Sequence, residues 1–154
     1  MEKTLILVKP DGIQRGLIGE IIGRFEKKGL KLIGLKMMNL DDAILDAHYS
    51  HLLEKSFFSE IKDFMKSSPI VAMAWEGGKD SVSAVRILVG PTKGHEAPAG
   101  TIRGDFGLSG SNNIVHASDS VENGINEVDR FFDANELFKY EKTEHVHIYS
   151  SSEK

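Results

Sequence analysis

The 154-residue chain contains no cysteine and has no long apolar run. Without cysteine, thiolate nucleophiles, disulfide frameworks, iron–sulfur clusters and zinc sites of the cysteine type are excluded. The continuous apolar segments, residues 5–8 and 70–75, are too short for a signal peptide or a membrane span. We therefore expect a cytoplasmic protein with no membrane partner.

An excess of positive charge is also missing. The chain has 19 Lys and Arg against 23 Asp and Glu, a formal net charge of −4. A protein held mainly by nucleic-acid phosphates needs a basic excess, so nucleic acid is not the expected partner and any anion site must be a local cluster. The length and composition predict a single domain over residues 1–154. A chain of this length buries roughly 70% of its unfolded surface, enough for a core without disulfides or a structural metal.

Hydrophobic spacing predicts the order of the elements. We expect strands at residues 5–8, 30–40, 70–75 and 114–115, and a terminal strand through His145 and His147. Helical spacing predicts a helix from residue 17 to 28 that ends at Gly29, and four others, around residues 44–53, 61–65, 82–89 and 121–132. Residues 91–113 show neither period, which predicts a long loop, either structured or disordered. This alternation leaves α/β and α+β folds open.

The standard glycine-rich phosphate motifs are absent. The segment Gly78-Lys79 does not continue as a P-loop, and there is no G-x-G-x-x-G. Dispersed residues could still clamp a polyphosphate if the fold gathers them, since Arg offers a bidentate fork and Lys a point charge. Taken one at a time, each is more simply a solvated surface group. The candidates are Lys9, Arg86, Thr92, Arg103 and Asn113.

One of the six histidines stands apart. His116 follows a short apolar segment and precedes a predicted helix N-terminus, where backbone N–H groups favour an anion. A neutral imidazole can attack a phosphoryl group to give a phosphoramidate, while a carboxylate such as Glu127 holds the other ring nitrogen. A core histidine satisfied by the backbone is the alternative. His145 and His147 lack a third ligand, so no protein metal site is expected.

Three segments then become recognisable as motifs. They are Leu7-Val8-Lys9-Pro10-Asp11-Gly12 with Gln14-Arg15-Gly16, Gly100-Thr101-Ile102-Arg103-Gly104-Asp105-Phe106, and Asn113-Ile114-Val115-His116-Ala117-Ser118-Asp119-Ser120. Together they closely resemble nucleoside diphosphate kinase, over nearly the whole chain. The resemblance implies an α+β, ferredoxin-like sandwich with an antiparallel four-stranded sheet, helices on one face and added helices.

The resemblance also implies a ping-pong reaction. The γ-phosphoryl of a nucleoside triphosphate, typically ATP, passes through a phosphohistidine at His116 to a nucleoside diphosphate, which maintains the NTP and dNTP pools. Mg²⁺ is the implied cofactor, held mainly by the nucleotide phosphates. The implied assembly is a homo-oligomer, a tetramer or a hexamer.

Roles for individual residues follow from the same resemblance. For the phosphates, Lys9 would neutralise the charge of the transferred phosphoryl group, Tyr49 would donate a hydrogen bond near it, and the other phosphates would be held by Arg86, Thr92 and Arg103. For the nucleoside, Asn113 would bind the ribose, and the base would contact Phe57 and Ile61. His116 would be oriented by Glu127 and Ser118, and Asp119 would contact the metal through water.

Two other functions remain open at this stage. The loop at residues 93–97 departs from the family's usual Asn-Pro-Ala, which motivates a nucleotide-binding module without turnover. Phe57 and the scattered Lys and Arg residues would suit nucleic acid, against which the net charge argues.

Overall fold

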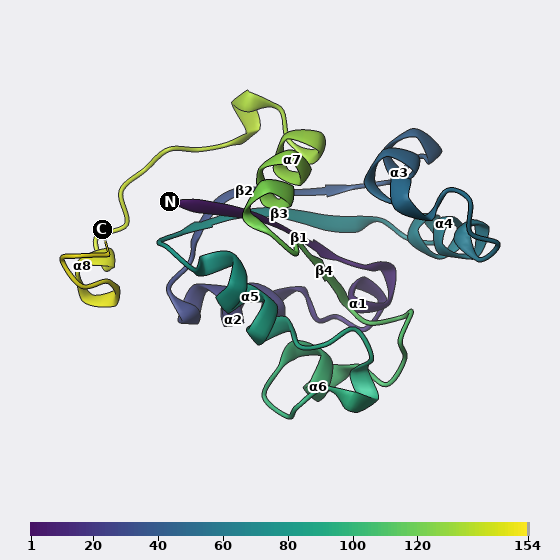
Figure 1. Ribbon diagram of the computed structural model, residues 1–154, viewed down its shortest axis with the longest axis horizontal. Coiled ribbons are helices and arrows are strands. Elements are labelled where there is room, and N and C mark those ends of the chain that lie inside the picture. Colours follow the sequence, from purple (N-terminus) through teal and green to yellow (C-terminus); the bar gives the residue numbers. More distant parts are fainter. Residues whose placement is uncertain (154) are drawn as a thin grey trace.

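The two most apolar segments form the centre of a four-stranded antiparallel sheet. The computed structural model describes residues 1–153. In it β1 (Glu2–Val8) pairs along its whole length with β3 (Ile70–Gly77), from Glu2 opposite Gly77 to Val8 opposite Val71. Outside them lie β2 (Lys31–Met38), next to β3, and β4 (Val115–Ala117), next to β1, in the order β2-β3-β1-β4 (Figure 1). This order and pairing are those of a ferredoxin-like α+β fold.

Short helices connect and cover the strands. The α-helices are α1 (Pro10–Gln14), α2 (Ile18–Lys28), α3 (Asp42–His48), α4 (Phe58–Lys66), α5 (Ser81–Val89), α6 (Ile102–Phe106), α7 (Val121–Phe131) and α8 (His145–Ile148), with 3₁₀ turns η1 (Ser50–Leu52), η2 (Gly94–Glu96) and η3 (Ala134–Glu136). Among residues 1–153, every helix is too short or too polar to cross a lipid bilayer.

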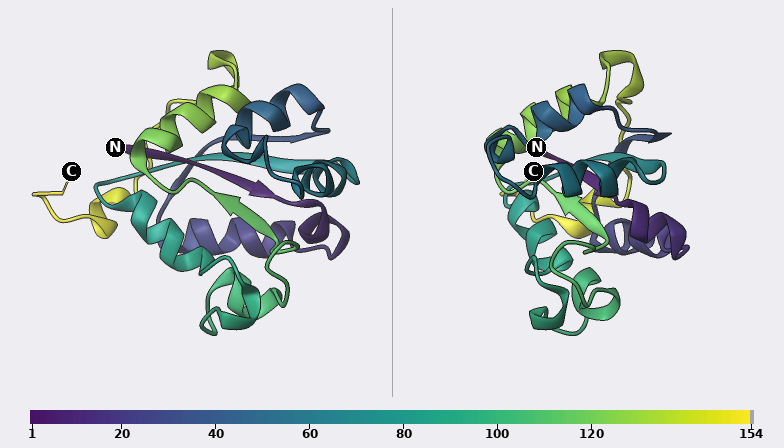
Figure 2. Two further views of the ribbon diagram at one scale, coloured as in Figure 1. Left: turned by 45° about the vertical axis from the view of Figure 1, so that its right-hand side comes forward. Right: turned by 90° about the vertical axis from the view of Figure 1, so that its right-hand side faces the viewer.

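The sheet buries both of its faces. Side chains alternate along β1, so Ile6 and Val8 pack with α2 and α5, whereas Leu5 and Leu7 pack with α7, α3 and α4. Figure 2 shows helices above and below the sheet. The crossover helices α2 and α5 share one face, as the ferredoxin-like expectation has it. The added helices α3, α4 and α7 cover the other face, because the continuous apolar run of β1 supplies two buried faces that both need cover.

Local signals mark the helix ends, as predicted for Gly29. Gly29 ends α2 in the left-handed region at φ 99°, and Asp41 caps α3 by accepting from the Ile44 amide at 2.9 Å. The terminal strand through His145 and His147 is wrong, since these residues form α8. A further strand would need a free sheet edge. At the edge strand β2, however, the Phe138 amide already donates to the Ile33 carbonyl, and at the end of the chain the Tyr149 hydroxyl accepts from the Gly78 amide.

Helix α7 crosses β1 at a glycine, and this contact sets where α7 lies. A Cβ at Gly124 would come 2.1 Å from the carbonyl oxygen of Lys3, too close for any carbon atom. We expect Gly124→Ala to lower the free energy of unfolding by about 1–3 kcal/mol, because backbone must shift to admit the methyl group. Gly23→Ala in α2 is the matched control: open space surrounds it, so better helix propensity should raise stability by about 0.5–1 kcal/mol. Chemical denaturation compares the two, and an unchanged Gly124→Ala midpoint would contradict the packing argument.

Candidate active site

One cavity of about 620 Å³ brings together residues that are far apart in the sequence. Its lining includes the predicted residues Lys9, Tyr49, Arg86, Thr92, Arg103, Asn113, His116, Asp119 and Glu127. A second cavity of about 280 Å³ shares Lys9, Tyr49, Thr92 and Asn113 with it and adds Phe57 and Ile61. The two are therefore parts of one cleft, with a polar end at His116 and an apolar end at Phe57. Ser118 is fully buried behind the polar end.

His116 is held by its place in the sheet and by a hydrogen bond from its ring to Glu127. It lies in the middle of β4, opposite Leu7 of β1. Its Nε2 is 2.9 Å from Oε2 of Glu127, and the Ser118 hydroxyl donates to the same oxygen at 2.7 Å. Since a carboxylate only accepts, the ring hydrogen is assigned to Nε2. The lone pair of Nδ1 is then free for attack.

The charge of Glu127 is maintained by its partners. Burial alone would raise the pKa of this carboxyl, but the hydrogen bonds from His116 and Ser118 outweigh it and lower the pKa below its usual value. Glu127 is therefore ionised at neutral pH. An ionised carboxylate holds the His116 tautomer and stabilises positive charge that develops on the ring.

A strained residue leads the chain into β4. Ile114 adopts φ 73°, in the left-handed region that β-branched residues avoid. Its amide donates to Asp11 Oδ2 at 3.0 Å and its carbonyl accepts from the Lys9 amide at 2.8 Å. Gly12 permits this approach, because a Cβ there would lie 3.1 Å from the Ile114 carbonyl oxygen. The turn after β1 thus fixes the residue that sets the start of β4, and with it His116.

Arg103 has a structural function that the sequence did not reveal. It is buried, and its guanidinium donates to three backbone carbonyls, those of Asn113 at 3.2 Å, Gly90 at 3.0 Å and Val115 at 2.7 Å. A guanidinium has five N–H groups, so two remain for a ligand. Arg103 therefore ties the long loop to β4 and still offers a fork to the cavity.

The buried cations of the cavity have lowered pKa values, which an anion would reverse. Burial, with the nearby charge of Arg103, lowers the pKa of Lys9 to about 8, and burial with the charge of Arg86 lowers the pKa of Arg103 to about 10. Burial, reinforced by the negative charge of Glu127, raises the pKa of Tyr49 to about 12, which keeps its hydroxyl a donor. Lys9 also donates to Asn113 Oδ1 at 2.7 Å. An incoming polyphosphate would relieve this mutual repulsion.

The lowered pKa of Lys9 predicts an alkaline limit on activity. As the pH rises through about 8, Lys9 loses its charge in the free protein, so kcat/KM for a nucleotide should fall. Bound phosphates stabilise the charged form, so kcat at saturation should decline only at higher pH. Initial rates between pH 6 and 10 check this. In Lys9→Arg, whose side chain stays charged, the alkaline limb of kcat/KM should disappear, and its persistence would assign the limb to another group.

His48 and Arg130 complete the wall behind His116, and the sequence analysis assigned neither to the site. The ring of His48 meets that of His116 edge to face, with centroids 4.5 Å apart, and it packs on Phe131 in the same way at 5.1 Å. Its Nδ1 lies 3.3 Å from Nη1 of Arg130. The only sequence signal was the spacing of Glu127 and Arg130, which puts them on one face of a helix.

One group of three side chains and one single carboxylate are the candidates for holding a metal ion. His48, His116 and Glu127 place three ligand atoms within 4.8 Å of one another. This nitrogen-rich set suits transition metals rather than Mg²⁺, and the guanidinium of Arg130 lies beside it. Asp119 is different: it is an oxygen donor that lines the same cavity as His116. One carboxylate beside a phosphate pocket suits a Mg²⁺ ion that arrives on a nucleotide.

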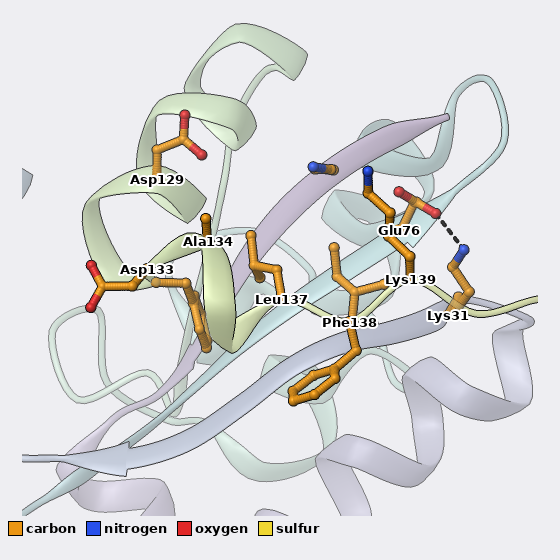
Figure 3. Close-up of a pocket in the computed structure, with 11 residues that line it drawn as sticks. Lys31, Glu76, Asp129, Asp133, Ala134, Leu137, Phe138 and Lys139 are labelled. Atoms are coloured by element: carbon orange, nitrogen blue, oxygen red, sulfur yellow. Dashed lines mark ion pairs between the residues drawn. The ribbon is translucent and has the colours of Figure 1, made fainter.

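A separate cavity of about 610 Å³ lies elsewhere, beside β2, β3 and the end of α7. Figure 3 shows Lys31 and Glu76 pointing toward one another, an ion pair of 2.6 Å, with Asp129 and Asp133 across the cavity. Its described lining contains no residue of the cleft around His116. The charges there partly neutralise one another, so this cavity does not compete as a phosphate site.

Comparison with known proteins gives consistent results over almost the whole chain. A family model described as nucleoside diphosphate kinase matches residues 2–137. A nucleoside diphosphate kinase of Parabacteroides distasonis is 52% identical over 153 residues, covering 99% of each chain. The solved structure of a halophilic nucleoside diphosphate kinase from Halobacterium salinarum in complex with CDP superposes with a TM-score of 0.93 at 41% identity, covering 97% of this chain and 99% of that one. A nucleoside diphosphate kinase family protein from Babesia bovis has the same TM-score at 46% identity, covering 97% and 100%.

Proposed function

The chain belongs to the nucleoside diphosphate kinase family, and on that premise we propose that His116 carries the phosphoryl group between two nucleotides. The single observation that supports this most directly is the bond between His116 Nε2 and Glu127, which leaves Nδ1 facing a cavity lined by cations. The general activity is that of the family, a phosphotransfer from a nucleoside triphosphate to a nucleoside diphosphate. The assignment of roles to individual residues is the proposal.

In the first half-reaction, Nδ1 of His116 attacks the γ-phosphorus of the triphosphate. An N–P bond forms, the bond from phosphorus to the bridging oxygen breaks, and the diphosphate leaves with that electron pair. Glu127 keeps the Nε2 hydrogen and stabilises the charge that develops on the ring. In the second half-reaction a terminal oxygen of another nucleoside diphosphate attacks the phosphohistidine, and His116 is regenerated.

Fixed cations would supply most of the rate by stabilising charge in the transition state. Lys9 lies at the end of β1, where its ammonium can meet the transferred phosphoryl group, and the Tyr49 hydroxyl can donate beside it. The two free N–H groups of Arg103 and the guanidinium of Arg86, with the Thr92 hydroxyl, would hold the remaining phosphates.

The apolar end of the cleft suits a base without specifying which one. Phe57 is about half exposed and lines the smaller cavity together with Ile61. A base can stack on an aromatic ring whatever its hydrogen-bonding edge, which fits a broad range of nucleotides. Asn113, whose amide lies where the two cavities meet, would bind the ribose hydroxyls.

Mg²⁺ is the cofactor that this donor set fits. The family is a phosphotransferase family that generally depends on a divalent metal. When bound, Mg²⁺ would neutralise charge on the nucleotide phosphates, and Asp119 would reach it through water. The side chain of Asp119 is fixed for this role by a 2.6 Å hydrogen bond from Asn123.

We also propose a cytoplasmic homo-oligomer, a tetramer or a hexamer. Support comes from β2, the edge strand next to β3, where the large apolar side chains Leu35 and Met37 are 51% and 57% exposed. Exposed apolar groups on a sheet edge are typical of a surface that another chain covers. Size-exclusion chromatography with light scattering measures the assembly, and a monomer at micromolar concentration would contradict this part of the proposal.

The test of the proposed function follows one phosphoryl group. The protein is mixed with ATP and Mg²⁺, and intact mass spectrometry should show one acid-labile phosphoryl group; added CDP should then remove it and become CTP. If ATP binds but neither adduct nor CTP forms, the protein is a nucleotide-binding module without turnover. Nucleic-acid binding is measured in parallel, and the net charge of −4 predicts none at physiological salt.

A further inference from the structure

Glu127 has two possible partners, His116 in the active site and Arg130 on its own helix. Glu127 and Arg130 are three residues apart on α7, the spacing at which oppositely charged side chains normally pair. In the described part of the chain Glu127 forms no ion pair with Arg130; Oε2 accepts instead from His116 and Ser118. The guanidinium and the carboxylate thus share one face of α7 without pairing.

His48 offers the guanidinium of Arg130 a different acceptor. Nη1 of Arg130 lies 3.3 Å from His48 Nδ1, and this same Nδ1 lies 4.0 Å from Oε1 of Glu127. Arginine can only donate, so Nδ1 accepts and the ring hydrogen is on Nε2. The same nitrogen atom of His48 is therefore near both the guanidinium and the carboxylate.

The state of the His48 ring suits this function. Its side chain is 1% exposed, and burial with the nearby His116 lowers its pKa to about 3, so the ring is neutral and Nδ1 keeps its lone pair. Its Nε2 is buried with no hydrogen-bond partner among residues 1–153. A buried N–H without a partner is costly, and a phenyl ring would fill the space without that cost. The presence of a histidine here therefore calls for a reason other than packing.

We propose that His48 is a positioning residue: by accepting a hydrogen bond from Arg130, it keeps this guanidinium from pairing with Glu127 and leaves the carboxylate to orient His116. The proposal rests on the proposed role of His116 as the phosphoryl carrier. His48 touches no reacting atom in this scheme. Its effect reaches the reaction through Arg130 and Glu127.

The experiment is a suppressor test. The rate of phosphohistidine formation from ATP and Mg²⁺ is measured in single turnover for the unmodified protein, His48→Phe, Arg130→Leu and the double variant. His48→Phe keeps an aromatic ring and removes the acceptor, so Arg130 is released toward Glu127 and the rate should fall by about tenfold to a hundredfold. The double variant should lie within about twofold of Arg130→Leu and above His48→Phe, because the acceptor at position 48 no longer matters once the competing guanidinium is gone.

Control variants separate positioning from packing. His48→Asn, whose amide oxygen can replace Nδ1 as an acceptor, should keep more of the rate than His48→Leu, which has a similar volume and no acceptor. This pair carries the same test if His48→Phe unfolds below its assay temperature. A residue that served only the packing of the core would not be rescued by a second substitution at Arg130.

A measurement without turnover keeps the two proposals apart. Nitrogen-15 NMR of histidine-labelled protein should show a single Nε2–H tautomer for His116, identified by its loss in His116→Asn, and a mixture of tautomers in His48→Phe. If the unmodified protein takes no phosphoryl group from ATP, the proposed function fails while the NMR result still decides the role of His48. A His48→Phe protein as fast as the unmodified one, or a double variant as slow as His48→Phe, would overturn the inference.

Discussion

His116→Ala is expected to abolish both half-reactions. Without Nδ1 there is no atom to form the N–P bond, and loss of a covalent nucleophile lowers kcat by roughly 10⁴-fold or more. Because His116 is partly exposed at the cavity wall and its backbone pairs with Leu7 whatever its side chain, the fold should survive. Intact mass after incubation with ATP and Mg²⁺ and the rate of CTP formation from CDP are the two readouts.

A matched control tests whether the loss is local. His147→Ala removes an exposed imidazole on α8, outside both cavities of the cleft, and should leave both readouts unchanged. Nucleotide binding to His116→Ala should persist, since the cations of the cavity remain. If His116→Ala still took up a phosphoryl group from ATP, another residue would be the carrier and the mechanism would be wrong.

Arg103→Ala should damage stability and nucleotide binding together. It leaves three backbone carbonyls without their donor, and each buried group that loses its partner costs about 1–3 kcal/mol, so we expect the free energy of unfolding to fall by about 3 kcal/mol or more. It also removes a guanidinium that lines the cavity and has two N–H groups left for a ligand, which should weaken nucleotide binding by roughly tenfold to a hundredfold. Calorimetric unfolding and titration with a nucleoside diphosphate measure the two effects.

Arg103→Lys shows which function of the guanidinium matters most. One ammonium group keeps the charge but cannot reach all three carbonyls, so stability should fall nearly as far as in Arg103→Ala, while part of the nucleotide affinity returns. Arg15→Ala is the control, since its guanidinium donates to a single carbonyl, that of Phe106, from an exposed position. A fully stable Arg103→Ala would show that the loop does not depend on these bonds.

Much of the fold followed from local signals. The apolar run at residues 5–8 predicted a strand, and Gly29 marked the end of α2. The order of the strands did not follow from periodicity, which left α/β and α+β open; the resemblance to a family supplied it. Which helices cover which face of the sheet, and the formation of α8 in place of a terminal strand, depended on contacts between distant segments.

In the candidate active site, too, some residues followed from local sequence signals and others depended on contacts between distant segments. His116 and Glu127 could be paired from a short apolar segment followed by a helix, and the structure places them 2.9 Å apart. The three carbonyls that Arg103 binds come from positions 90, 113 and 115, whose meeting depends on the path of the whole loop. His48 lies on α3, and nothing near it in the sequence indicates that α3 would face α7.

The backbone at Ile114 links the folding of this protein to its selectivity for one reaction geometry. A β-branched residue at φ 73° costs conformational energy that a glycine there would not. Glycine, however, would let the chain sample other directions as it enters β4, and the angle at which the imidazole meets phosphorus would spread. Low backbone strain and a single direction for the chain entering β4 therefore place opposite demands on one dihedral angle, and with isoleucine the chain keeps the single direction at the cost of strain.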